Sequence, residues 1–242
     1  MSIANCGIDE RGRASGGRAG DNNGKEWRVR SWYYYPWKLV IRHPDAKVRA
    51  KIAALAKAGA LNNHIGYDQS QRGTFWTQLQ KAKYNPAKIK VKCEADCSAS
   101  TSAIVKAVGH ILGKSKLKNV PSTCTTRNLE SELRKAGFKV LKQTKYTKSQ
   151  NYLLPGDILL CPGHHVAINL TTGSKVKKKP VAKPAAKKTT AKKTTSTKKS
   201  VHDVAKEVIQ GKWGTGDARK AKLKKAGYDP SAVQKEVNKI LK

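Results

Sequence analysis

Apolar residues in the first part of the chain recur mostly three and four positions apart, a spacing that is typical of amphipathic helices. Glycines such as Gly59, Gly113 and Gly137 end these runs, as expected at the ends of helices. Helices are therefore predicted at residues 45–59, 74–83, 97–113 and 126–136.

Shorter apolar runs follow the helices and predict strands. One covers residues 138–141, and two more lie on either side of a turn at Pro162-Gly163 within residues 155–170. Helices followed by a small antiparallel sheet indicate an α+β domain over residues 1–173.

Residues 1–44 are first rich in glycine and arginine and then rich in aromatic side chains. The aromatic residues are Trp27, Trp32, Tyr33, Tyr34, Tyr35 and Trp37. They fit an N-terminal arm whose rings pack on the domain body, or a platform that binds a sugar or a peptide. Packing is the favoured interpretation, because aromatic side chains contribute mainly buried area.

The composition changes abruptly at residue 174. Residues 174–200 consist almost entirely of Lys, Pro, Ala, Thr and Ser and contain no acidic residue, so we predict a disordered basic linker. Residues 201–242 again show helical periodicity, interrupted at Gly211 and Gly227, and predict a small three-helix bundle.

The formal net charge is +34, from 50 Lys and Arg against 16 Asp and Glu. Such a charge indicates polyanionic surroundings, either nucleic acid or the anionic polymers of a bacterial wall. No apolar run reaches the roughly 18 residues that would predict a membrane span. The first residues lack the basic and apolar parts of a signal peptide, and five cysteines, an odd number, argue against a complete disulfide framework.

Cys97 stands at the start of a predicted helix, where unpaired N–H groups and the helix dipole favour a thiolate. A cysteine nucleophile also needs a histidine, and His164 and His165 lie at the mouth of the last predicted strand. Neighbours on a strand point to opposite faces, so only one of the two can face Cys97. An inert buried cysteine is one alternative. Zinc bound through Cys93 and Cys97 is a weaker one, because no second Cys/His pair has ligand spacing.

The segments around these residues resemble the NlpC-type cysteine peptidases, which are papain-like peptidoglycan hydrolases. The resemblance rests on three motifs: Asp96-Cys97-Ser98 before an apolar helix, Gly156-Asp157-Ile158-Leu159-Leu160, and His165-Val166-Ala167-Ile168. Residues 17–37 and 65–72 are also similar to phage endolysins that carry such a domain.

The resemblance implies that Cys97 is the nucleophile and that its backbone N–H meets the oxyanion. It implies that His165, directly before Val-Ala-Ile, is the general base, with Tyr67, Asp96 and Ser98 supporting the site, and it calls for no cofactor. A third, orienting residue is expected. Asn169 shares a face with His165, but four residues along a strand span roughly 13 Å, so the third position stays open.

Residues 201–242 resemble the choline-independent cell-wall-binding repeat at the C-terminus of some phage lysozymes. The resemblance rests on Gly211-Lys212-Trp213-Gly214-Thr215-Gly216, on Arg219 and on Ala226-Gly227-Tyr228-Asp229. It implies wall binding through Trp213, Gly214, Gly216 and Arg219. Trp213 could equally fill the small core of the bundle.

These features predict an endolysin that hydrolyses peptide bonds of the peptidoglycan stem peptide. An N-acetylmuramoyl-L-alanine amidase on the same fold is the alternative. The expected partners are muropeptide and, through the linker, anionic wall polymers. Specific nucleic-acid binding is not expected, because no groove-binding motif is readable. We expect synthesis in the host cytoplasm without a signal peptide and action on the wall after release. A nonenzymatic basic binder of wall or nucleic acid remains the rival class.

Overall fold

The computed structural model describes residues 1–176, 200–209 and 212–240. The chain divides into two compact units, Met1–Pro180 and Val181–Lys242, which are described separately. Most of the predicted linker, residues 177–199, lies outside the described residues, as do the predicted helix end at Gly211 and the apolar Leu241.

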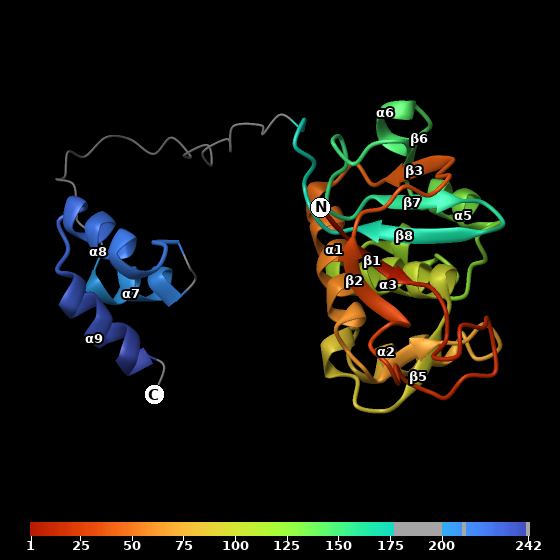
Figure 1. Ribbon diagram of the computed structural model, residues 1–242, viewed down its shortest axis with the longest axis horizontal. Helices are drawn as coiled ribbons and strands as arrows, with labels where there is room; N and C mark the ends of the chain where they lie inside the picture. The colour runs from red at the N-terminus through yellow and green to blue at the C-terminus, as the bar shows by residue number, and fades with distance from the viewer. Residues whose placement is uncertain (177–199, 210–211, 241–242) are drawn as a thin grey trace. The chain divides into compact units, whose positions relative to one another are not determined.

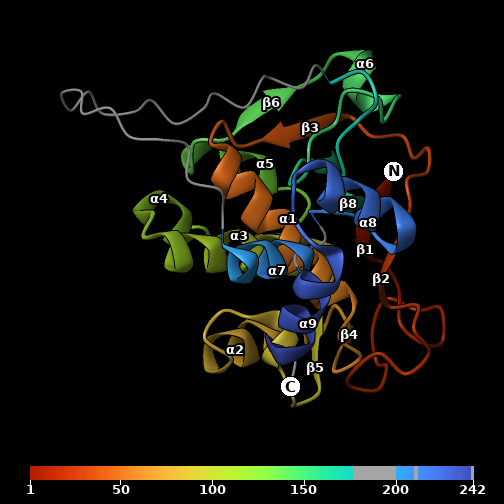
Figure 2. The same ribbon diagram turned by 90° about the vertical axis from the view of Figure 1, so that its left-hand side faces the viewer.

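A six-stranded sheet in the order β2-β1-β8-β7-β3-β6 forms the centre of the first unit (Figure 1). Its strands are β1 (Ser2–Cys6), β2 (Trp27–Ser31), β3 (Leu39–Arg42), β6 (Lys139–Leu141), β7 (Ile158–Cys161) and β8 (His165–Asn169). Every neighbouring pair is antiparallel. Figures 1 and 2 show β6 at one end of this sheet and β2 at the other. A separate parallel pair joins β4 (Ile65–Tyr67) and β5 (Cys93–Ala95).

The two faces of the large sheet belong to different apolar clusters. Ala4, Val166 and Ile168 face the main core with the helices, whereas Ile3 and Ala167 belong to a second cluster on the opposite face. Side chains alternate along strands, so His165 and Asn5 belong with the second face. The rings of Trp37, Tyr33 and Tyr35 cover this second face at the start of β8.

Helices of the first unit vary from one turn to four turns. They are α1 (Ala46–Ala60), α2 (Thr74–Lys81), the 3₁₀ helix η1 (Pro86–Lys88), α3 (Cys97–Leu112), α4 (Ser115–Lys118), α5 (Leu129–Lys135) and α6 (Thr144–Thr147). The two longest, α1 and α3, pack on each other and on the sheet, and α3 lies against β8. Their buried faces build the main core.

Local sequence signals account for the ends of α1 and α3. Asp45 caps α1 by accepting a hydrogen bond from the N–H of Lys47, and Asp96 caps α3 by accepting bonds from the N–H groups of Ser98 and Ala99. Gly113 ends α3 with φ of 65°, a left-handed conformation that glycine adopts without steric cost. Both helices therefore begin and end close to where the periodicity predicts.

The prediction that helices come first and the sheet afterwards is wrong. The segment interpreted as an N-terminal arm supplies β1, β2 and β3, half of the six-stranded sheet, before the first helix begins. Of its aromatic rings, Trp27 and Trp37 are buried, Tyr34 is exposed, and the others are partly buried, which agrees with the packing interpretation. Tyr67, expected in a polar segment between helices, instead ends β4. The mixed α/β class is confirmed.

The C-terminal unit contains the three predicted helices. They are α7 (Val201–Ile209), α8 (Gly216–Lys225) and α9 (Pro230–Ile240). Their core consists of six buried residues with Trp213 and Tyr228 packed at its margin: Val204, Ala205, Val208, Leu223, Val233 and Val237. A core of this size is small, so each of these residues matters for the stability of the unit.

Within the part of the chain that is described, no helix combines the length and the apolar character needed to span a bilayer.

Candidate functional site

Cys97 is the first residue of α3 and is almost completely buried. Burial raises the pKa of the Cys97 thiol to about 11, and the Asp96 carboxylate adds to the rise. Hydrogen bonds from the N–H groups of Val166 and Ser98 and the charge of Arg72 oppose it only in part. The helix start was expected to favour a thiolate. Burial opposes that effect, and with a pKa of about 11 the thiol is neutral at pH 7.

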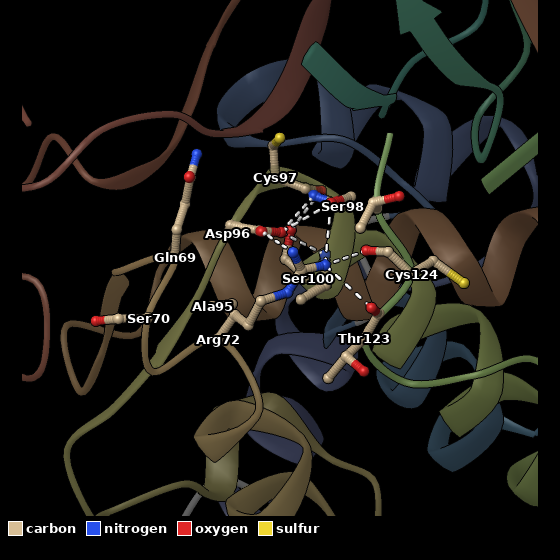
Figure 3. Close-up of polar contacts among 12 residues, drawn as sticks. Gln69, Ser70, Arg72, Ala95, Asp96, Cys97, Ser98, Ser100, Thr123 and Cys124 are labelled. Carbon is tan, nitrogen blue, oxygen red and sulfur yellow. Dashed lines mark hydrogen bonds and ion pairs between the residues drawn. The ribbon is translucent and has the colours of Figure 1, made fainter. Parts of the chain in front are cut away.

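Asp96 anchors a polar network below the thiol (Figure 3). One carboxylate oxygen accepts hydrogen bonds from the Ser98 N–H at 2.8 Å, the Ala99 N–H at 2.7 Å and the Ser98 hydroxyl at 2.9 Å. The other forms a 2.8 Å ion pair with Arg72, which also donates to the carbonyls of Thr123 and Cys124. The Cys97 sulfur points away from this network, so Asp96, Ser98 and Arg72 fix the helix start without blocking the thiol.

His165 begins β8, and its ring is held by a residue from the other end of the chain. The distance from His165 Nε2 to Asn5 Oδ1 is 2.9 Å, and the Tyr33 hydroxyl donates to the same Asn5 oxygen at 3.2 Å. An amide oxygen can only accept, so this contact favours the tautomer with the proton on Nε2. Nδ1 is then the basic nitrogen, and it has no hydrogen-bond partner among the described residues.

Aromatic rings shield the His165 imidazole from water. Its centroid lies 5.9 Å from Trp37, which stacks on it, and 5.6 Å from Tyr35, which meets it edge-on. Burial, assisted by the nearby charge of Arg30, lowers the pKa of His165 to about 4, so the ring is neutral at pH 7. His164, the competing histidine, is exposed in the turn before the strand.

Cys97 and His165 both lie near the start of β8. Within residues 1–176, β1 pairs with β8 only at Ile3–Asn169 and Ala4–Ile168, which leaves the start of β8 without a partner on that side. The Cys97 thiol is close enough to the N–H of Val166, the residue that follows His165, for this group to lower the pKa of the thiol. No hydrogen bond joins thiol and imidazole in the described residues.

Tyr67 lies close enough to Cys97 for the two groups to interact electrostatically. Burial raises the pKa of the Tyr67 hydroxyl, Cys97 raises it further, and a hydrogen bond from Gln69 at 3.1 Å opposes the rise. Asn169 instead donates to the carbonyls of Leu154 and Thr171, a structural role. Asn5, which sequence reasoning missed, contacts the His165 ring. No local signal marks it, because only the pairing of β1 with β8 brings it to His165.

The described residues contain no group of three or more His, Cys, Asp or Glu side chains arranged to hold a metal ion. Cys93, the other half of the zinc alternative, is buried in β5, and burial raises the pKa of its thiol to about 12.

The C-terminal unit has a groove of about 670 Å³ between α8 and α9. Arg219 lies in it and donates to Gln234 Oε1 at 2.8 Å, and Gln234 donates in turn to Asn238 at 2.8 Å. Trp213 is half-buried instead. Its indole N–H donates to Glu207 at 3.1 Å and its ring meets Tyr228 edge-on at 6.1 Å. Among the predicted wall-binding residues, only Arg219 lines the groove. Trp213, Gly214 and Gly216 do not.

Comparison with known proteins agrees with this division of the chain. The endolysin-like domain family matches residues 3–176, and the CW_7 repeat family matches residues 202–241. A 45-residue segment is 59% identical to the protein named Lysozyme from Streptococcus phage Cp-7. The segment represents 19% of this chain and 13% of that lysozyme. No solved structure matches the chain. Because the first match covers most of its length, the chain belongs to the endolysin-like domain family, and it carries a C-terminal CW_7 repeat.

Proposed function

We propose that the protein hydrolyses peptide bonds of bacterial peptidoglycan, with Cys97 as nucleophile and His165 as general base in a papain-like, NlpC-type site. One observation carries the proposal. A cysteine at a helix start lies beside the first residues of β8, where Asn5 orients a histidine with its basic nitrogen unengaged. Nucleophile, base and orienting group are the three parts that covalent acyl transfer needs.

The reaction follows from the protonation states. As the Cys97 sulfur attacks the scissile carbonyl carbon, its proton passes to His165 Nδ1, since both groups are neutral at pH 7. The imidazolium then protonates the leaving amine nitrogen, and the carbon–nitrogen bond breaks to leave a thioester on Cys97. Water, deprotonated by the same ring, releases the acid product and restores the thiol.

The bond that is cut separates the two candidate activities. We propose cleavage within the stem peptide, which leaves peptide fragments on the sugar chain. An amidase would release whole stem peptides from the lactyl group. Mass analysis of purified walls after digestion distinguishes the two. Release of sugar ends without new amino groups would contradict both, because a thioester mechanism cuts amides.

Asn5 offers a test of the orienting contact. Asn5→Asp keeps the oxygen that accepts from His165 and adds a negative charge, which stabilises the imidazolium and raises the pKa of His165 from about 4. Activity of the wild type should be lost only as the pH falls through about 4, because the protonated ring can no longer accept a proton. In Asn5→Asp this acidic limb should move to higher pH.

Asn5→Ala should lower kcat by up to about 100-fold, because the ring loses its orientation. Activity measured from pH 3 to pH 8 checks both variants. If the acidic limb of the pH–activity profile does not shift in Asn5→Asp, Asn5 supports only the fold.

The C-terminal unit is proposed to hold the enzyme on the wall. Arg219 is held in place by Gln234, so its remaining N–H groups face the groove in a fixed geometry that suits carboxylate or amide oxygens of a muropeptide. Trp213 is assigned to the core of the unit, in view of its contacts with Glu207 and Tyr228.

Arg219→Ala should weaken wall binding about tenfold, because a charge-assisted hydrogen bond is lost. Binding is measured by sedimentation with purified walls, using full-length protein that also carries Cys97→Ala so that the walls stay intact. Lys206→Ala is the matched control, since Lys206 is an exposed cation outside the groove. Equal binding by Arg219→Ala and the control would remove the groove from wall recognition.

A further inference from the structure

Two arginines on the edge strand β2 lie beside the proposed catalytic histidine. In the β1–β2 pair, Arg28 stands directly opposite Asn5, and Arg30 stands directly opposite Ile3. Directly opposed residues share a face of an antiparallel sheet, so both arginines lie on the face of Asn5 and the His165 ring. The cation of Arg30 acts on His165 itself, since it contributes to the lowered pKa of that ring.

Neither of these two guanidinium groups has an acidic partner in the part of the chain that is described. Arg42 and Arg72, which are also partly buried, form ion pairs with Asp157 and Asp96 at 2.6 and 2.8 Å. In contrast, no ion pair links Arg28 or Arg30 to any acidic side chain in the described residues. Arg28 Nε is buried and has no hydrogen-bond partner among the residues that the structure describes. A buried donor without a partner is costly, and such groups in native proteins call for an explanation.

The geometry around Arg30 leaves its hydrogen-bonding edge available. The guanidinium lies over the Tyr33 ring at 4.1 Å, and the Tyr33 hydroxyl donates to Asn5. Stacking occupies the flat face of the group and leaves the N–H donors in its plane, which suit the two oxygens of a carboxylate. Arg28, Arg30 and Cys97 all act electrostatically on the Tyr33 hydroxyl, which places the two cations and the nucleophile around one side chain.

We propose that Arg28 and Arg30 bind a carboxylate group of the peptide substrate next to the scissile bond. The inference rests on the proposed function and names its substrate class, an acidic peptide whose free carboxylate is required for tight binding. The bound carboxylate also neutralises the charge that disfavours the imidazolium. The base is therefore strengthened when the substrate is in place.

Matched peptides test this proposal with the full-length protein. Each synthetic stem peptide is compared with a form in which one carboxylate is replaced by a carboxamide. In one pair the C-terminal carboxylate is replaced, and in the other pair an internal carboxylate is replaced. The pair in which the free acid is the better substrate identifies the carboxylate that the arginines bind. The wild type should show at least about tenfold higher kcat/KM for the free acid of one pair.

Arg28→Gln and Arg30→Gln should raise KM for that acid about tenfold and change KM for its carboxamide less than about twofold. Arg28→Lys and Arg30→Lys should give KM values for the acid between those of the wild type and the glutamine variants. Arg127→Gln is the matched control, because Arg127 is an exposed arginine. Equal losses on acid and carboxamide would assign the arginines to folding alone. An acid preference that survives both glutamine substitutions would overturn the proposal.

A binding measurement separates this inference from the proposed function. Calorimetric titration of Cys97→Ala protein with the same peptides reports the acid preference without catalysis. If Cys97→Ala still cleaves walls but binds the free acid more tightly than the carboxamide, the mechanism fails and the carboxylate site stands. If cleavage depends on Cys97 and binding shows no acid preference, the carboxylate site fails and the mechanism stands.

Discussion

Cys97→Ala is expected to reduce wall lysis by about 10⁴-fold or more, because no other group can form the thioester intermediate. Removing a nearly buried sulfur beside Val166 leaves only a small cavity, so the fold and the C-terminal unit should remain intact. Lysis is measured as the fall in turbidity of purified walls, and sedimentation with the same walls measures binding. Binding should be unchanged while lysis is lost.

Cys93→Ala is the matched control for this experiment. Cys93 is also buried, lies four residues away, and has a thiol whose pKa burial raises to about 12. Its replacement should leave lysis within about threefold of the wild type and cost about 1 kcal/mol of stability at most. Normal lysis by Cys97→Ala, or a folded but inactive Cys93→Ala, would show that the nucleophile is misassigned.

Arg72→Leu is expected to lower the free energy of unfolding by about 3 to 5 kcal/mol, because it leaves the buried Asp96 carboxylate without its cation. The substitution also removes the donors that satisfy the carbonyls of Thr123 and Cys124. In a domain of this size the melting temperature should fall by about 10 °C. Thermal and urea unfolding followed by tryptophan fluorescence measure the change.

The control for Arg72 is Arg134→Leu, which breaks an exposed ion pair with Glu130 and should cost less than about 1 kcal/mol. Adding Asp96→Asn to Arg72→Leu should recover part of the lost stability. Asparagine still caps the helix and carries no buried charge. Similar losses for Arg72→Leu and Arg134→Leu would mean that the Asp96 ion pair does not hold the start of α3.

The sequence predicts the start of α3 well because the signals for it are local. Asp96 as cap, the apolar periodicity of the helix and Gly113 as its end all lie within 18 residues of one another. The same holds for β7 and β8, which a short Pro-Gly turn joins. In these segments, backbone preferences and hydrophobic pattern point to the same structure.

Asn5 and the two arginines could not be found in this way. Asn5 reaches His165 only because β1 pairs with β8, across 160 residues of sequence, and Arg28 shares their face only because β2 pairs with β1. The segment between β1 and β2 is rich in glycine and arginine, a composition typical of irregular structure. The strands on either side of it were therefore not predicted. The local sequence shows only the helix start, which favours a thiolate at Cys97. Burial, which depends on the whole fold, raises the pKa of this thiol and could not be read from the sequence.

The central claim is that Cys97 forms a covalent bond with the peptidoglycan peptide, and trapping this thioester tests it most directly. Full-length protein is mixed with soluble wall fragments, quenched with acid within seconds and analysed by mass spectrometry. The account predicts an added mass equal to the acyl fragment, located at Cys97 by fragmentation, retained in Cys93→Ala and absent in Cys97→Ala. Cleavage of the fragments by Cys97→Ala, with no adduct at Cys97 in the wild type, would contradict it.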